Sequence, residues 1–237
     1  MRRTWTLAAG MLLMLAPAMA RAQSLEDYDY ENLTFRGAGL TVGYIWPTKV
    51  EPTLSYGVRI DLGYLGPGLR VVPSVTYWSS ELKGAELDRL AEQLSSLPTL
   101  RNRGIVVRGA DLGPVDWSGV AFELDGQFVW IVPGGILTYL GAGLNAHLLD
   151  ARGDGIKDTF VEDALDALTA GLTGLAGIEI EPVRRLRIFG EVRYTVMSDL
   201  RYPGLRFGAS FMLPGAAGAA TVGSAATGER GRASGPR

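Results

Sequence analysis

Residues 55–78 read SYGVRIDLGYL, then GPG, then LRVVPSVTYW. In the first arm apolar side chains alternate with Gly, Arg and Asp, and after the turn at residues 66–68 the alternation resumes. Alternation with a period of two on both sides of a tight turn predicts a β-hairpin. Each arm has about ten residues, the length with which a tilted strand crosses a membrane.

The same alternation recurs along the chain and predicts an all-β fold of eight antiparallel strands. Pro73 lies in mid-strand and lacks a backbone N–H, so we expect a bulge or a local irregularity there. The predicted strands are residues 34–46, 55–65, 69–78, 117–132, 136–148, 169–181, 186–196 and 204–213.

The predicted connections alternate between short and long. Those after the second, fourth and sixth strands are short, at residues 66–68, 133–135 and 182–185. The others are longer, above all residues 79–116 and 149–168, and each of these two contains apolar residues at helical spacing (residues 84–97 and 160–168). Transmembrane β-barrels have short periplasmic turns and long outer loops. The pattern therefore predicts an up-and-down transmembrane β-barrel with short helices in two extracellular loops.

Charged side chains lie opposite the continuous apolar face of the predicted strands. The interior of an eight-stranded barrel is narrow, so a Gly-rich polar face fits inside better than a face of large apolar side chains. Because the two signs are nearly balanced, we expect a charge network inside the lumen, which more readily forms an ion-paired plug than a conducting path. A soluble, lipocalin-like barrel with these charges in water is the alternative. The predicted lumen charges are Arg59, Asp61, Arg70, Glu123, Asp125, Glu179, Arg187, Glu191, Arg193 and Arg206.

The two ends of the chain differ from the barrel in composition. Residues 1–22 combine a basic start, a short apolar centre and a small-x-small site, which predicts a secretory signal peptide. We expect residues 23–33 to be a periplasmic lead-in, residues 34–213 the barrel, and the Gly- and Ala-rich residues 214–237 a disordered tail. The chain has no cysteine, so no disulfide stabilises it.

With its signal peptide, its eight amphipathic strands and a last strand that ends GASFML, the sequence resembles the small outer-membrane β-barrel family of OmpA-like, OmpX-like and OmpW-like proteins. The resemblance implies a bacterial outer-membrane location with both termini in the periplasm. It also implies contact with outer-membrane lipids, including lipopolysaccharide, and with the barrel assembly machinery, which reads an aromatic residue of the final strand such as Phe211. The tail that follows Phe211 departs from the family pattern.

His147 is the only histidine and is predicted to face the lumen, with Asn145 and Tyr139 on the same face. Nucleophilic catalysis would need an adjacent nucleophile and an orienting acid, but no serine lies within a few residues, and Asp150 is the nearest acid. We therefore interpret these three residues as a weak candidate for a hydrogen-bonding site in the lumen and predict no catalytic residue.

Asp150, Asp154 and Asp158 have a spacing that suggests a calcium loop, but Arg152 and Val161 occupy positions where an EF-hand needs oxygen ligands. No metal site and no cofactor is predicted. The formal net charge of −2 gives no reason to expect nucleic-acid binding.

The leading hypothesis is a non-enzymatic barrel with a structural or surface-interaction role, with a possible extracellular ligand at residues 79–116 and 149–168. A narrow, OmpW-like pore for small molecules and a lipid-modifying outer-membrane enzyme are the alternatives.

Overall fold

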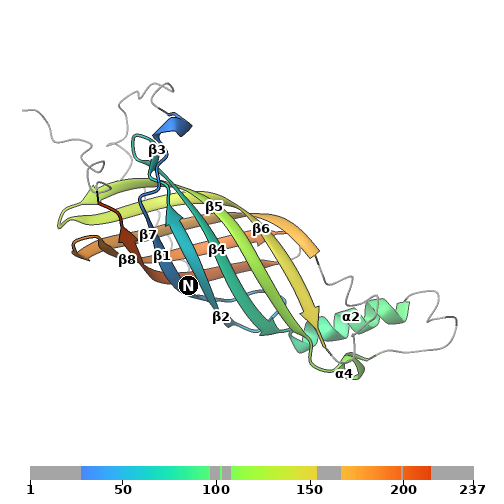
Figure 1. The fold of residues 1–237 in the computed structure, drawn as a ribbon. Coiled ribbons are helices and arrows are strands. Elements are labelled where there is room, and N and C mark those ends of the chain that lie inside the picture. The colour runs from blue at the N-terminus through green and yellow to red at the C-terminus, as the bar shows by residue number, and fades with distance from the viewer. Residues whose placement is uncertain (1–27, 97–101, 103–107, 154–166, 199, 215–237) are drawn as a thin grey trace, which may run out of the picture.

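The described residues form one closed antiparallel barrel (Figure 1). This computed structural model describes residues 28–96, 102, 108–153, 167–198 and 200–214. Strands consecutive in the chain pair with each other, except that β2 and β3 both pair with β4. The barrel closes because β1 pairs with both β2 and β9. The strands are β1 (Gly37–Ile45), β2 (Thr53–Asp61), β3 (Tyr64–Gly66), β4 (Leu69–Glu81), β5 (Asp116–Val132), β6 (Ile136–Arg152), β7 (Ala167–Val183), β8 (Leu186–Met197) and β9 (Arg201–Met212).

The eight predicted strands are confirmed, because β2 and β3 are two parts of one of them. Both pair with β4, β2 through Ser55–Arg59 and β3 through Tyr64 and Gly66. The break lies beside Pro73. Val71 donates its N–H to the Gly63 carbonyl, so this N–H points toward the strand formed by β2 and β3. N–H groups two residues apart on a strand point the same way. The N–H that Pro73 lacks would therefore also point toward β2 and β3, where their pairing with β4 is interrupted. The expected irregularity thus lies on the neighbouring strand, while Pro73 itself pairs regularly with Leu124 of β5.

Several strands continue into segments predicted as loops. β4 runs on to Glu81, β5 begins at Asp116, β6 runs on to Arg152 and β9 begins at Arg201. These extensions contain polar residues or depart from apolar alternation, so the sequence pattern did not predict strands there. Their backbones nevertheless pair with neighbouring strands, as Asp116 does with Arg152. The long connections are accordingly shorter than predicted.

The helix predicted in the first long connection is confirmed as α2 (Gly84–Ser96), which packs against the short α4 (Gly109–Leu112) of the same connection. Both lie beyond the long-loop end of the barrel (Figure 1). The helix predicted in the second long connection lies outside the described residues. A 3-10 turn, η3 (Tyr30–Asn32), contacts β3 at the opposite end. None of the helices in the described segments is long and apolar enough to cross a membrane.

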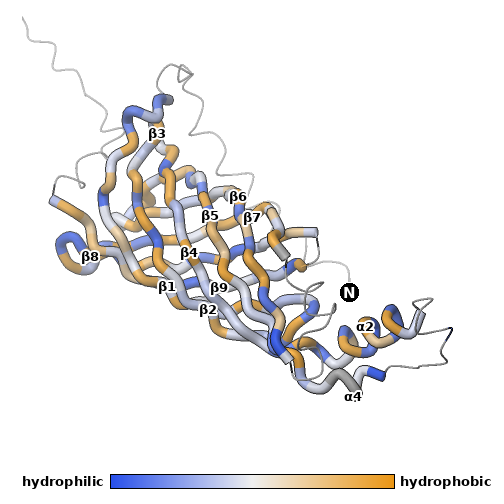
Figure 2. The backbone as a smooth tube through the Cα atoms, turned by 45° about the vertical axis from the view of Figure 1, so that its right-hand side comes forward, coloured by the Kyte–Doolittle hydropathy of each residue, from blue (hydrophilic) through white to orange (hydrophobic). Residues whose placement is uncertain are grey.

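Figure 2 shows apolar and polar residues interspersed along the strands, and the apolar ones form the outer surface of the barrel wall. Leu40, Leu144 and Leu172 expose 71%, 63% and 62% of their surface, whereas ten charged residues on the opposite face of the strands are buried. A water-soluble protein rarely exposes so large a contiguous apolar surface. The soluble alternative, with the charges in water, is therefore wrong. We call this exposed apolar outer surface of the strands the apolar belt. Aromatic residues flank it, among them Tyr56 and Tyr77, which lie opposite each other on β2 and β4.

Candidate functional site: the filled interior of the barrel

Within the described strands the buried charged side chains are five arginines and five carboxylates. They reach the interior because they occupy alternate positions whose neighbours face outward. All ten positions were assigned to the inner face from the sequence. They are Arg59, Asp61, Arg70, Glu123, Asp125, Glu179, Arg187, Glu191, Arg193 and Arg206.

One cluster of charges lies toward the short-turn end. Arg70 Nη1 lies 3.1 Å from Glu179 Oε2 and 3.6 Å from Asp61 Oδ2, and Arg187 Nη1 lies 3.1 Å from Glu179 Oε1. Arg70 also donates to Gln127 Oε1 at 2.8 Å. The Arg59 guanidinium lies over the Phe189 ring at 4.0 Å, a cation–π distance. Arg70 and Glu179 belong to β4 and β7, so their ion pair spans the interior.

A second cluster, the central cluster, is formed by Glu123, Asp125, Glu191, Arg193 and Arg206. Arg193 Nη1 lies 2.8 Å from Asp125 Oδ2 and 2.8 Å from Glu191 Oε1. Arg206 Nη2 lies 2.8 Å from Glu123 Oε2. Each guanidinium contacts more than one carboxylate, so the buried charges compensate one another directly.

Neutral residues complete the hydrogen bonds of the central cluster. The Ser74 hydroxyl donates to Glu123 Oε2 at 2.6 Å, and the Tyr139 hydroxyl donates to Glu191 Oε2 at 3.0 Å. Tyr139, a weak site candidate from the sequence, therefore joins the charge network and is separate from the other two candidates.

Inward-facing glycines give the large side chains room. A Cβ atom added to Gly177 would lie 2.5 Å from the Tyr139 hydroxyl, and one added to Gly208 would lie 2.6 Å from Cζ of Phe189. Gly177 pairs with Tyr139 and Gly208 pairs with Phe189, so each ring lies over the bare backbone of the neighbouring strand. The interior is filled by side chains, as is usual for eight strands.

Asn145 and His147 lie nearer the long-loop end. Asn145 Nδ2 donates to the Thr173 hydroxyl at 2.8 Å, and that hydroxyl lies 2.9 Å from Thr195 Oγ1. His147 is fully buried, and its ring meets Tyr202 edge to face at 6.4 Å. Neither His147 ring nitrogen has a hydrogen-bond partner in the described part of the chain. Asn145 and His147 are thus close in the wall, but no nucleophile hydrogen-bonds to the histidine.

An apolar cluster fills the long-loop end of the barrel, and we call it the outer plug. Trp78 and Trp117 form its centre, with ring centroids 6.3 Å apart at 84°. The sequence prediction missed it. Its signal was present, because the inward-facing positions change from charged to large and apolar near the ends of β4, β5, β6 and β8. Its residues are Ile45, Val50, Trp78, Leu82, Ala91, Leu94, Val115, Trp117, Leu149, Ala151, Met197, Leu200 and Tyr202.

The connections around the outer plug are held together by hydrogen bonds. Lys83 donates its side-chain ammonium to the Pro47 carbonyl at 2.8 Å, and its backbone N–H bonds the Lys49 carbonyl. Val50 and Leu82 form an isolated β-bridge. The connection between β1 and β2 is thereby tied to the start of the long connection between β4 and β5, which stabilises the plug at this end.

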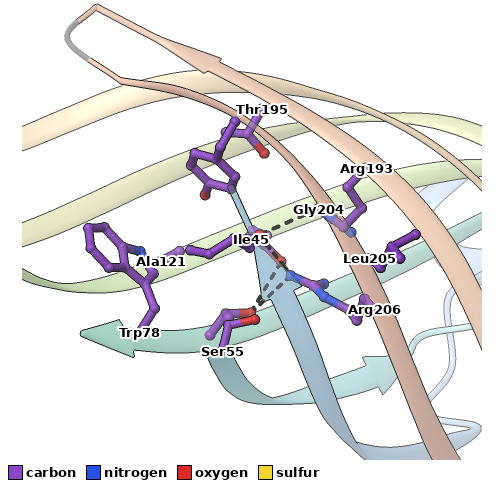
Figure 3. Close-up of a pocket in the computed structure, with 12 residues that line it drawn as sticks. Ile45, Ser55, Trp78, Ala121, Arg193, Thr195, Gly204, Leu205 and Arg206 are labelled. Carbon is purple, nitrogen blue, oxygen red and sulfur yellow. Dashed lines mark hydrogen bonds and ion pairs between the residues drawn. The ribbon is translucent and has the colours of Figure 1, made fainter. Parts of the chain in front are cut away.

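Between the central cluster and the outer plug lies a cavity of about 20 Å³ (Figure 3). Its walls combine charged groups of the cluster with residues of the plug. The residues that line the cavity are Ile45, Ser55, Thr76, Trp78, Ala121, Glu123, Arg193, Thr195, Tyr202, Gly204, Leu205 and Arg206.

No group of three or more histidine or carboxylate side chains suited to a metal occurs within the described ranges. Asp150, the first residue of the calcium pattern weighed from the sequence, forms an ion pair with Arg152 at 2.8 Å. The rest of that acidic pattern lies outside the described residues.

Comparison with known proteins finds similarity only at the level of structure. No family model matches the chain, and no curated protein matches it in sequence. Neisserial surface protein A is similar over 75% of this chain and 97% of its own, with a TM-score of 0.50 and 12% identity. The chain has the fold of the small eight-stranded outer-membrane β-barrels. The resemblance inferred from the sequence is thus confirmed for the fold.

Two further barrels of this fold are less similar. Ail of Yersinia pestis matches 76% of this chain and 99% of its own, with a TM-score of 0.45 and 10% identity. The N-terminal barrel domain of Pseudomonas aeruginosa OprF matches 74% of this chain and 97% of its own, with a TM-score of 0.39 and 14% identity.

Proposed function

We propose that the protein is a non-enzymatic outer-membrane β-barrel that acts as an envelope component or presents a surface for interaction, and that its lumen does not conduct. The observation that carries this proposal is the filled interior. Ion pairs cross the lumen at two levels, and the outer plug lies above them. Opening a path would separate buried charges and would hydrate the Trp78–Trp117 contact, and both changes cost free energy.

Planar-bilayer recording tests this proposal. Protein refolded in detergent is first checked for heat-modifiable gel migration, which reports a closed barrel, and is then added to the bilayer with a general porin as positive control. We expect no unitary conductance steps. Reproducible steps from folded protein would contradict the proposal and would support the narrow-pore alternative.

The absence of enzymatic activity is also part of the proposal. His147 is fully buried beneath the outer plug, where a lipid ester cannot reach it without rearrangement. We expect the purified protein to release no fatty acid from phospholipid or lipid A, and His147→Ala to behave identically. Release that His147→Ala abolishes would support the lipid-modifying alternative.

The proposed location follows from the belt and from the chain ends. The apolar belt contacts outer-membrane lipids, including lipopolysaccharide in the outer leaflet. Gly37 and Met212 pair with each other near the short-turn end, so both ends of the barrel emerge on the side that we assign to the periplasm. Phe211 on the last strand, 57% exposed, is the residue offered to the barrel assembly machinery. The signal peptide (1–22), the lead-in (23–33) and the tail (214–237) belong to the same proposal.

The proposed interaction surface is at the opposite end. Residues 82–115 form the longest connection there, and α2 turns a polar side that includes Asp88, Arg89, Glu92 and Gln93 toward solvent. With residues 153–166, this connection is where we place an extracellular ligand. Binding of the folded barrel to host or cell-surface material, compared with a variant that has a short linker in place of residues 84–112, tests that assignment. Equal binding by both would exclude this connection.

A further inference from the structure

The cavity beneath the outer plug is lined by both polar and apolar side chains. Figure 3 shows Trp78 from β4, Thr195 from β8 and Arg206 from β9 converging around it. Its volume of about 20 Å³ is enough for about one water-sized molecule. Glu123 belongs both to the cavity wall and to the central cluster, and Trp78 belongs both to the wall and to the outer plug.

Unsatisfied hydrogen-bonding groups gather at this level of the barrel. Trp78 Nε1, on a side chain that is 1% exposed, has no hydrogen-bond partner in the described structure. Neither do Asn145 Oδ1 or the two His147 ring nitrogens. Asn145 pairs in register with Glu123, and His147 pairs with Ala121, so both lie beside residues of the cavity wall. Buried polar atoms without partners cost free energy, and such atoms in native proteins usually bond ordered water.

We propose that this cavity is a binding site for one ordered water molecule. The water accepts the hydrogen bond of Trp78 Nε1–H and donates to oxygen acceptors of the wall, Glu123 and Thr195. A guest that both accepts and donates is required, because the wall offers an indole donor on one side and a carboxylate on the other.

The charges around the cavity argue against an anion. The cavity wall carries Glu123, Arg193 and Arg206, and both guanidinium groups are already paired with carboxylates of the central cluster. That cluster contains three carboxylates and two guanidinium groups, so it has one excess negative charge. A halide or an oxyanion would add to that excess in a region of low dielectric constant. An apolar guest would leave the Trp78 donor unsatisfied. Water meets both conditions, because it accepts the hydrogen bond of the indole N–H and donates to oxygen.

NMR of the folded, 15N-labelled barrel tests the proposal. We expect magnetisation transfer from a long-lived water to one indole N–H that disappears from the spectrum in Trp78→Phe. Trp117→Phe is the matched control, since Trp117 belongs to the plug but not to the cavity wall, and it should keep the transfer. Absence of any long-lived water contact at the Trp78 indole would overturn the proposal.

Filling the cavity gives an independent test. Ala121 is 1% exposed and lines the cavity, so Ala121→Val should displace the water and abolish the transfer, while heat-modifiable migration shows that the barrel remains closed. Transfer that persists in this folded variant would place the water elsewhere and overturn the proposal. A shift of the Trp78 indole resonance that saturates with sodium bromide, but not with sodium fluoride at the same ionic strength, would reveal an anion site and also overturn it.

Discussion

Arg206 Nη2 lies 2.8 Å from Glu123 Oε2, although Arg206 is on β9 and Glu123 is on β5. These strands are not neighbours in the sheet, since β9 pairs with β8 and β1, and β5 pairs with β4 and β6. The ion pair therefore crosses the lumen. It joins opposite walls and, with the Arg70–Glu179 pair, makes the interior a packed polar core.

Neutralising one partner of this pair should destabilise the barrel. Glu123→Gln leaves Arg206 and Arg193 with less compensation in a buried site, and we expect the free energy of unfolding to fall by about 3 kcal/mol. Urea titration in lipid vesicles, followed by tryptophan fluorescence, measures the change. Glu86→Gln is the matched control: Glu86 pairs with Arg89 on α2, whose side chain is 71% exposed, and the loss should stay below about 1 kcal/mol. Equal losses would show that the lumen pair contributes no more than a surface pair.

Gly177→Ala tests the close packing of the interior. The new methyl group would lie 2.5 Å from the Tyr139 hydroxyl, which must move from its bond to Glu191, so we expect a loss of about 1–3 kcal/mol. Gly174→Ala on the same strand meets nothing within 4 Å and should be neutral or stabilising by up to about 1 kcal/mol. The same unfolding titration compares them, and equal stabilities would contradict a filled lumen.

A charge on the outer face should be costly where it meets lipid. Leu172 is 62% exposed on β7, and Leu172→Arg should reduce stability by about 2–4 kcal/mol in a bilayer, as for arginine near the bilayer midplane. Leu168→Arg, on the same face at the outer end of the strand, should cost about 0–1 kcal/mol. A cost for Leu172→Arg no larger than that for Leu168→Arg would argue against a lipid boundary at this depth.

The strands and their faces could be predicted because each depends only on alternation along one segment. Arg193 and Asp125 were assigned to the barrel interior only because they occupy alternate positions on the polar face of their strands. Which charges pair could not be predicted, because partners such as Arg206 and Glu123 lie 83 residues apart and their distance depends on barrel closure. The β2–β3 break was foreseen only as an irregularity at Pro73, because its position depends on which neighbour the missing N–H faces.

The outer plug escaped prediction for a different reason. Its residues come from strand ends and from connections, for example Trp78, Val115 and Leu200, which share no periodicity. Their burial results from the three-dimensional convergence of those segments. The Trp78 and Trp117 positions on the inner face were the available signal, but only a closed barrel brings the two rings into contact.

The proposed topology gives a cellular prediction, and the absence of native cysteine makes single-cysteine labelling unambiguous. Ser96→Cys at the exposed end of α2 should react with a membrane-impermeant maleimide on intact cells. Arg184→Cys, exposed in the short turn between β7 and β8, should react only after the outer membrane is permeabilised. The reverse pattern would show the opposite orientation.

The central claim is that the apolar outer face of this barrel lies in lipid. Leu144, 63% exposed on β6, is the most direct probe of it. A nitroxide attached to Leu144→Cys in reconstituted vesicles can be tested by electron paramagnetic resonance for collisions with oxygen, which partitions into lipid, and with a polar nickel chelate, which remains in water. We predict high accessibility to oxygen and low accessibility to nickel. High accessibility to nickel with little oxygen enhancement would place this face in water and show that it does not lie in lipid.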